Sequence, residues 1–350
     1  MRKQNIVAVD LFCGIGGLTH GLMKEGLDVV AGIDFDPTCK FAYEKNNKAK
    51  FINKSITEVS SNSIRKLYPK GAIKVLVGCA PCQPFSSYNR KKKGKADEKW
   101  GLLYEFLRIV QDVKPHIVSM ENVPQIRNQK VFKDFVDGLK SIKYKVNFQI
   151  VHATRYGVPQ TRKRLILLAS KLSDISLIPE THSMEKFVTV KDAIGGLEPI
   201  NDGEASKTDP LHRARALNPI NKRRIINTPL GGGWKDWDKT LQLKCHKKKT
   251  GKSFRSVYGR MWWDKPSPTI TTHCTGLGNG RFGHPEQDRA ISLREAALLQ
   301  TFPPEYEFVK DYSEYSSHTV ALHIGNAVPV VLGEIIGKSI KTHLHQTFSK

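Results

Sequence analysis

Cys79 and Cys82 follow a short apolar run at 75–77, and their spacing suits three kinds of chemistry. A zinc site needs two more ligands, and the Cys and His pairs at 245–246 and 273–274 lack suitable spacing. A redox-active disulfide is compatible with Cys-Ala-Pro-Cys after a strand. In the third possibility Cys82 is a nucleophile on a proline-stiffened turn at the carboxyl end of a strand. A thiol is the most nucleophilic side chain near neutral pH and can add to an electron-poor ring carbon.

Charged side chains stand at the ends of two other apolar runs. The run at 116–120 leads into Glu121, so a carboxyl group is expected at the same edge of the sheet as the cysteines. The run at 165–169 follows Arg162 and Arg164, which strand alternation places on one face. A zinc site or a redox pair would leave this carboxyl group and these cations without a role. The combination therefore favours the nucleophile.

A glycine-rich turn follows the first apolar run of the chain and contains Gly14 and Gly16. Asp34 stands 20 residues after Gly14, where an acid can hold the two hydroxyls of a ribose. A dinucleotide site would have a third glycine where this chain has Thr19. The aromatic Phe12 favours a single adenosine group, as in S-adenosylmethionine enzymes. The alternative is a tight strand-to-helix turn that binds no ligand.

The elements that must position these groups alternate between strands and helices in the first half of the chain. Short runs too apolar to alternate predict strands buried on both faces, at 6–9, 28–33, 75–77, 116–120 and 165–169. Helical segments are predicted between and after them, at 17–25, 38–45, 102–113, 131–140, 292–300 and 328–343. This order predicts an α/β fold with a doubly wound, mostly parallel sheet.

Three regions follow from this pattern. Residues 1–180 are predicted to form a domain that contains the catalytic residues and binds the cofactor. Residues 181–290, rich in Gly, Pro, Trp and Lys, are predicted to form a smaller, irregular and basic domain. Residues 291–350 are expected to form a hinge and a C-terminal segment that returns to the first domain.

The composition points to a polyanionic partner. The chain has 350 residues and a formal net charge of +23, and residues 211–260 hold 14 Lys and Arg against two acids. Aromatic and glycine residues are interleaved with these cations, as on surfaces that grip phosphates and pack against bases. A second basic run lies at 90–95; the simplest alternative for both is a solvated surface. Six cysteines are too few for a disulfide scaffold, and no apolar run approaches the length of a membrane span, so we expect a reduced, cytoplasmic protein.

Together the motifs resemble the ordered series of DNA cytosine-5 methyltransferases. They are Phe-x-Gly-x-Gly-Gly, Pro-Cys-Gln, Glu-Asn-Val, Gln-x-Arg-x-Arg, the segment at 294–303 and Gly-Asn-Ala-Val-Pro at 325–329. The resemblance spans residues 6 to about 340 and implies the S-adenosylmethionine-dependent methyltransferase fold. The basic insertion lies where that family has its target recognition domain.

The resemblance implies a role for each catalytic residue. Cys82 would attack cytosine C6 and make C5 nucleophilic, and Glu121 would hydrogen-bond N3 and the exocyclic amine. Arg162 would contact the O2 side of the base, with Arg164 in support. The target base must be flipped out of the duplex, because the chemistry cannot occur inside the stack.

The resemblance also implies S-adenosylmethionine as the cofactor, no metal, and a set of binding residues. The cofactor residues would be Phe12, Gly14, Gly16, Asp34, Phe35, Pro81, Leu103 and Asn326. Two positions depart from the family pattern. Many relatives have an acid before Ile56, where this chain has Ser55, and an arginine is common where this chain has Trp100.

The expected partner is double-stranded DNA read at a specific short sequence. The residues expected to contact it are Gln83, Ser86, Arg90, Lys91, Trp234, Trp237 and Arg255. We expect a monomer in the prokaryotic cytoplasm, associated with the nucleoid through DNA and not with a membrane, which can act beside a restriction endonuclease of the same specificity. The alternatives are a tRNA cytosine-5 methyltransferase of the same fold, which the long insertion disfavours, and a DNA-binding protein without activity, which the intact motifs disfavour.

Overall fold

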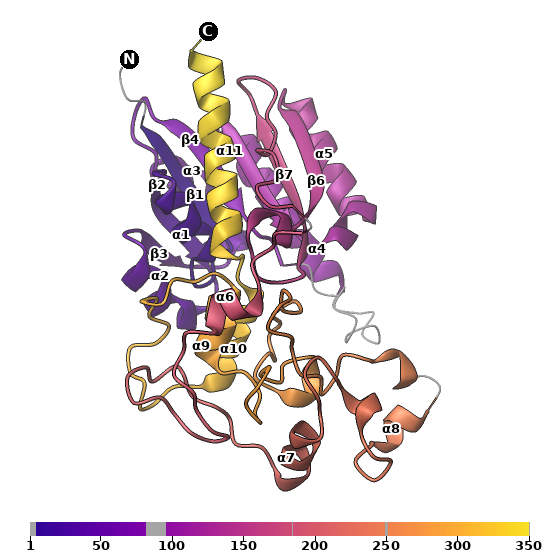
Figure 1. Cartoon of the computed structure of the whole chain (residues 1–350). Coiled ribbons are helices and arrows are strands. Elements are labelled where there is room, and N and C mark those ends of the chain that lie inside the picture. Colours follow the sequence, from indigo (N-terminus) through magenta and orange to yellow (C-terminus); the bar gives the residue numbers. More distant parts are fainter. Residues whose placement is uncertain (1–4, 82–95, 184, 249–250, 350) are drawn as a thin grey trace. The chain divides into compact units, whose positions relative to one another are not determined.

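The computed structural model describes residues 5–81, 96–183, 185–248 and 251–349, with the side chains of 96–100 and 252 excepted. The chain forms two compact units (Figure 1). Unit 1 comprises residues 1–152, 163–180 and 328–350, and unit 2 comprises 153–162 and 181–327. Residues 291–327, which the sequence analysis assigned to a hinge and C-terminal segment, are grouped with unit 2.

Unit 1 is built on a seven-stranded sheet in the order β3-β2-β1-β4-β5-β7-β6. The strands are β1 (Ile6–Leu11), β2 (Asp28–Asp34), β3 (Lys50–Asn53), β4 (Ile73–Gly78), β5 (Ile117–Asn122), β6 (Lys145–His152) and β7 (Lys163–Ser170). The five strands from β3 to β5 are parallel, whereas β7 runs antiparallel to both β5 and β6. The prediction of a doubly wound, mostly parallel sheet is confirmed.

One face of this sheet is covered by helices from the middle of the chain. They are α3 (Ser61–Arg65), α4 (Ala96–Val113) and α5 (Lys130–Ser141). Phe106 of α4 and Phe135 of α5 are buried with ring centroids 5.4 Å apart, and both belong to the same core cluster as Leu76 and Val118 of the sheet. Apolar strands buried on both faces need such cover on each side.

The opposite face carries α1 (Gly17–Lys24) and α11 (Val330–Phe348), the long C-terminal helix that crosses the strands (Figure 1). A Cβ on Gly21 would lie 2.3 Å from the Val330 carbonyl oxygen, so only glycine allows the two helices to approach this closely. His343 of α11 is hydrogen-bonded to Ser170 of β7 at 2.8 Å. The C-terminal segment therefore completes the fold of unit 1.

Residues 317–348 contain an 18-residue window apolar enough to cross a membrane by length and composition, with a mean hydropathy of 1.6. However, 72% of that window is buried inside the folded protein. A helical segment buried to this extent is typical of a protein core.

The sequence analysis did not predict two of the strands, for different physical reasons. Strand β3 has only four residues, which is too short for a periodic signal. Strand β6 lies at the edge of the sheet, and most of its residues are exposed. Its apolar residues Phe148 and Ile150 are 36% and 40% exposed, so no continuous buried run marks it.

Unit 2 has short helices joined by long irregular segments. They are α6 (Val190–Ile194), α7 (Pro219–Ile226), α8 (Lys244–Lys247), α9 (Leu293–Leu299) and α10 (Ser317–Asn326). The remaining helix of unit 1 is α2 (Lys40–Asn46), and single turns of 3-10 helix occur at Pro37–Cys39, Ile56–Glu58, Pro124–Asn128, Ala153–Tyr156, Trp234–Asp236, Gly251–Ser253 and Leu277–Asn279.

A buried arginine organises the irregular part of unit 2. Arg260 is only 3% exposed and pairs with Asp288 at 2.6 Å. Its guanidinium also donates to the carbonyl oxygens of Ile225, Thr228 and His284. Five donors in a rigid fork can join several loop carbonyls that no helix or strand satisfies.

Candidate active site

The glycine-rich turn leaves β1 in an unusual backbone conformation. Phe12, Gly14 and Gly16 have φ values of +60°, +51° and +87°, in the left-handed region that favours glycine. The turn is tied to β2, because the Gly14 N–H donates to Asp34 Oδ2 at 2.9 Å. A Cβ on Gly14 would have no atom within 4 Å, so this side of the turn borders open space. A ligand can approach the main chain here.

Asp34 and Phe35 stand beside that turn at the end of β2. Each oxygen of the Asp34 carboxylate accepts a backbone N–H, Oδ2 from Gly14 and Oδ1 from Asp36, which fixes its orientation. The Phe35 ring is 69% exposed, an unusual state for a large apolar side chain next to a buried strand. An oriented carboxylate, an exposed ring and an open glycine turn form a donor set that fits an adenosine group. Ser55, at the position where the resemblance implies an acid in many relatives, is hydrogen-bonded to Thr57 at 2.7 Å.

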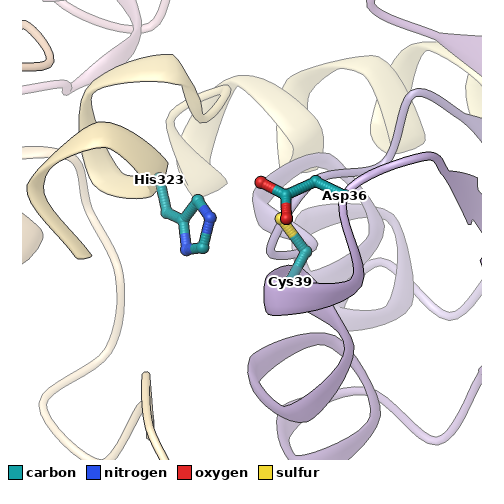
Figure 2. A group of neighbouring side chains, drawn as sticks. All are labelled: Asp36, Cys39 and His323. Carbon is teal, nitrogen blue, oxygen red and sulfur yellow. The ribbon is translucent and has the colours of Figure 1, made fainter. Parts of the chain in front are cut away.

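The turn after Asp34 also carries Asp36 and Cys39 (Figure 2). Asp36 Oδ1 accepts the backbone N–H and the hydroxyl of Thr38 at 2.9 and 2.6 Å, so this carboxylate caps the turn. Burial, together with the charges of Asp34 and Asp36, raises the pKa of the Cys39 thiol far above its usual range. His323, the third side chain in the figure, belongs to α10 of unit 2. The carboxylate and the thiol therefore have structural roles in unit 1.

Asp10, near the end of β1, is a buried acid behind the glycine turn. It is 1% exposed, and Thr19 of α1 donates to its Oδ2 at 2.7 Å. Its Oδ1 has no hydrogen-bond partner among the described residues. Burial, with a smaller contribution from the negative charge of Asp34, raises the pKa of Asp10 to about 7. A single acidic residue within an apolar run was the only signal of this site in the sequence.

Replacing Asp10 by Asn is expected to stabilise the protein increasingly with pH. The native pKa is raised, so the native state binds more protons than the unfolded state, and the Asp10 contribution to stability is lost as pH rises from about 4 to about 7. Relative to the wild type, Asp10→Asn should gain about 3 kcal/mol in free energy of unfolding between pH 5 and pH 8.5. Urea unfolding at both pH values measures this gain. Asp28→Asn, at an exposed carboxyl group, is the control; a gain for Asp10→Asn that does not change with pH contradicts the prediction.

Glu121 and Arg164 form a buried ion pair across β5 and β7. The Glu121 side chain is 8% exposed, and Arg164 Nε lies 2.7 Å from its Oε1. The two groups attract as charges, and Oε1 accepts no hydrogen bond from any described residue. A buried carboxylate oxygen with capacity to spare can take a hydrogen bond from a substrate.

Cys79 lies next to this pair. Burial, and then the negative charge of Glu121, raise the pKa of the Cys79 thiol well above its usual range. Cys79 is therefore a thiol rather than a thiolate at neutral pH, and it is not suited to act as a nucleophile. Cys82 lies outside the described residues.

Arg162 has different surroundings from Arg164, although only one residue separates them. It precedes β7 and belongs to unit 2, where its guanidinium is buried and donates to the carbonyl oxygens of Ile270 and Ala327, both at 3.2 Å. The sequence analysis placed Arg162 and Arg164 on one face of a strand. In the structure β7 begins at Lys163, so only Arg164 is held by the sheet.

The other predicted site residues are placed as follows. Pro81 is half-buried, Leu103 lies on α4 and is buried in the core, and Asn326 is exposed at the end of α10 in unit 2. Besides Cys82, the expected DNA contacts that lie outside the described residues are Gln83, Ser86, Arg90 and Lys91.

The insertion places its aromatic residues differently from the sequence-based expectation. Trp234 and Trp237 are 5% and 4% exposed and form a small core with Leu241. Their indole N–H groups donate to Phe254 O and Thr228 Oγ1, so both are satisfied internally. These indoles thus build the insertion rather than present a surface, because each buries a large apolar area. Arg255, in contrast, is exposed.

Known proteins similar to this chain belong to one family. The family model for C-5 cytosine-specific DNA methylases matches residues 6–342. Type II methylase M.HgiDII of Herpetosiphon aurantiacus is 53% identical over 339 residues, covering 96% of this chain and 95% of that protein. Type II methyltransferase M.Eco47II of Escherichia coli is 31% identical over 360 residues, covering 99% of this chain and 82% of that protein.

A solved structure shows the same fold at lower sequence similarity. A prophage-encoded protein of Escherichia coli, described as a DNA modification methyltransferase, aligns with a TM-score of 0.72 at 23% identity, covering 97% of this chain and 99% of that one. The resemblance inferred from the motifs is therefore confirmed. The chain belongs to the C-5 cytosine-specific DNA methylase family and is a DNA cytosine-5 methyltransferase.

Proposed function

We propose that the protein transfers the methyl group of S-adenosylmethionine to C5 of a cytosine within a specific short sequence of double-stranded DNA. The observation that carries this proposal is the buried Glu121–Arg164 pair, whose carboxylate oxygen lies 2.7 Å from the arginine and keeps hydrogen-bonding capacity. Family membership supplies the reaction class, and this pair supplies a group able to stabilise charge on the base.

The proposed reaction begins at Cys82. Cytosine C5 is too weak a nucleophile to take a methyl group directly, so the Cys82 thiolate adds to C6 and converts the ring into an enamine. Glu121 hydrogen-bonds N3 and the exocyclic amine, which stabilises the electron density that moves into the ring. C5 then takes the methyl group, as the S–CH3 bond of the sulfonium breaks and a thioether leaves. A base, such as water, removes the C5 proton, and elimination releases the Cys82 thiolate and restores the aromatic ring.

The two arginines have separate roles in this scheme. Arg164 positions Glu121, because its Nε lies 2.7 Å from the carboxylate oxygen Oε1. Arg162 orients the base from the O2 side. The base must leave the duplex to reach these groups, so we propose base flipping as part of the reaction.

The cofactor supplies an electrophilic methyl group when bound. Asp34, oriented by two backbone N–H groups, would hold the ribose hydroxyls, and the exposed Phe35 ring would pack on the adenine. The open turn at Gly14 and Gly16, with Phe12, would take the methionine end. Pro81, Leu103 and Asn326 would complete the site.

The partners and location follow from the same proposal. Two relatives are named Type II enzymes, so we propose that this protein modifies DNA as part of a restriction-modification system and protects sites cut by a cognate endonuclease. We further propose that it acts as a monomer in the cytoplasm of a prokaryotic cell. Its excess of 56 Lys and Arg over 33 Asp and Glu suits a DNA-bound protein.

The direct test is to incubate the protein with duplex DNA and labelled S-adenosylmethionine and then to sequence the methylated cytosines. Methylation confined to C5 of one cytosine in one short sequence is expected. Label incorporated into tRNA but not into DNA would instead support the tRNA cytosine-5 methyltransferase alternative.

Replacing Cys82 by Ser should lower the rate of methyl transfer by more than about a thousandfold, because a neutral hydroxyl is a far poorer nucleophile than a thiolate. Cys245→Ser, at an exposed cysteine, should leave the rate unchanged. DNA carrying 5-fluorocytosine has no C5 proton to remove and should trap a covalent adduct with the wild type but not with Cys82→Ser. An adduct formed by Cys82→Ser, or loss of transfer in a folded Cys79→Ser variant, would contradict the assignment and favour a Cys79–Cys82 redox pair.

A further inference from the structure

Unit 2 contains a cleft of about 510 Å³. The predicted DNA contacts that the structure describes, Trp234, Trp237 and Arg255, do not line it. Three segments form its walls: the stretch 213–216, the loop 272–279 and the beginning of α10. Small apolar side chains of Ala214, Ala216 and Ala321 contribute to the lining, so the cleft keeps its volume between the larger polar groups.

The cleft lining is strongly cationic. Arg213 and Arg215 are exposed, and both line the cleft together with Ala214, which is 3% exposed. His273 and His318 face each other in the same lining, with ring centroids 5.6 Å apart. No Asp or Glu in the described part of the chain lines the cleft.

The two cleft arginines differ from the buried arginines of the same unit. Arg260, Arg289 and Arg294 each pair with an acid, at 2.6, 2.7 and 2.5 Å. Among the described residues, neither Arg213 nor Arg215 forms an ion pair or a side-chain hydrogen bond. Arg213 and Arg215 thus lack the acidic partner that these three buried guanidinium groups have, and at the cleft they are available to an external anion.

The other polar groups suit a nucleotide rather than a simple inorganic ion. Thr272, Asn279 and Tyr315 add donors and acceptors near the arginines. The Tyr315 and histidine rings offer flat apolar faces of the kind that pack on a sugar or base. The volume of the cleft, its positive charge and its aromatic rings together suit one nucleotide of a DNA strand, with the phosphate placed at the guanidinium groups.

We propose that this cleft holds a phosphodiester of the DNA backbone, with Arg213 and Arg215 as its direct phosphate contacts. The inference rests on the proposed function and deepens it, because it assigns part of the DNA affinity to residues outside the predicted contact set. Phosphate contacts position a protein on DNA without reading sequence. The cleft is therefore expected to determine how tightly the protein binds DNA and where it sits along the duplex, rather than which base sequence it recognises.

The test uses the double variant Arg213→Gln/Arg215→Gln in the full chain. Its affinity for a duplex that contains the methylated sequence should fall about ten- to hundredfold, and the slope of log K against log salt should decrease by about 1.8, corresponding to two phosphates. The position of the methylated cytosine should not change. Arg213→Lys/Arg215→Lys keeps both charges and should retain the wild-type salt slope.

The matched control removes two charges elsewhere. Lys66→Gln/Lys70→Gln, at two exposed lysines in unit 1, should leave duplex affinity and salt slope unchanged. Equal thermal unfolding midpoints for the glutamine variants and the wild type exclude misfolding as the cause of weaker binding.

Two results would overturn the proposal. One is an unchanged affinity and salt slope in the double glutamine variant. The other is loss of deoxycytidine monophosphate binding with normal duplex binding, which would identify a site for small phosphate anions. Failure of the proposed function gives a different result: wild-type protein that methylates no DNA, whatever the duplex affinity of the cleft variants.

Discussion

Glu121→Gln should slow methyl transfer by about a hundred- to thousandfold, the usual cost of losing one group that stabilises charge developing in the transition state. Glutamine keeps the size of the side chain, but its neutral amide cannot stabilise the base as a carboxyl group does. It also leaves the half-buried Arg164 without the carboxylate that lies 2.7 Å from it. Single-turnover methylation with saturating DNA and S-adenosylmethionine measures the chemical step.

Two further measurements separate this effect from a general defect. Glu105→Gln, which removes a surface ion pair with Arg108, should leave the single-turnover rate unchanged. Binding of the cofactor to Glu121→Gln should stay normal, because Glu121 is not among the proposed cofactor residues. A wild-type rate for Glu121→Gln would exclude Glu121 from the chemistry.

Glu295→Gln should lower the free energy of unfolding by about 3–5 kcal/mol, because it leaves a buried cation without its counterion. Arg289 is 0% exposed, and its Nη1 and Nη2 atoms donate to the two oxygens of Glu295 at 2.8 and 2.7 Å. The same carboxylate accepts the backbone N–H of Ser292 at 2.6 Å and so caps α9. Urea unfolding at pH 7 measures the loss.

The pH dependence provides a second measurement for this pair. Burial alone would raise the pKa of Glu295, but the hydrogen bonds and charge of Arg289 outweigh it and hold the pKa below its usual range. The stabilisation is therefore present above the ordinary carboxyl pKa and is lost as pH falls through the lower native value. The difference in free energy of unfolding between Glu295→Gln and the wild type should therefore become smaller at acidic pH.

The neighbouring histidine does not replace Arg289 as the counterion. Burial, with a contribution from Arg289, lowers the pKa of His284 to about 4, so the ring is neutral at pH 7. Glu286→Gln, at an exposed acid in the same segment, is the matched control and should change stability by less than about 0.5 kcal/mol. If Glu295→Gln also lowered the free energy of unfolding by less than about 0.5 kcal/mol, the role assigned to the buried Arg289–Glu295 pair would be contradicted.

Features that depend on local patterns could be predicted from the sequence. Continuous apolar runs predicted β1, β2, β4, β5 and β7, because strands buried on both faces contain few polar residues. Glycine spacing predicted the turn after β1, since only particular residues tolerate positive φ. The ordered motifs indicated the family before any geometry was available, and the family model confirms it.

Which of these residues contact one another, and which are buried, depends on the tertiary structure. Arg164 pairs with Glu121, 43 positions earlier in the chain, while Arg162 donates to carbonyl oxygens far along the sequence in unit 2. Trp234 is buried in a small core, whereas Arg213 remains exposed without a counterion. Burial and ion pairing depend on contacts between distant parts of the chain, which residue type and spacing do not encode locally. The pKa of Asp10, the exposed cations of the cleft and the spare oxygen of Glu121 all arise from such contacts.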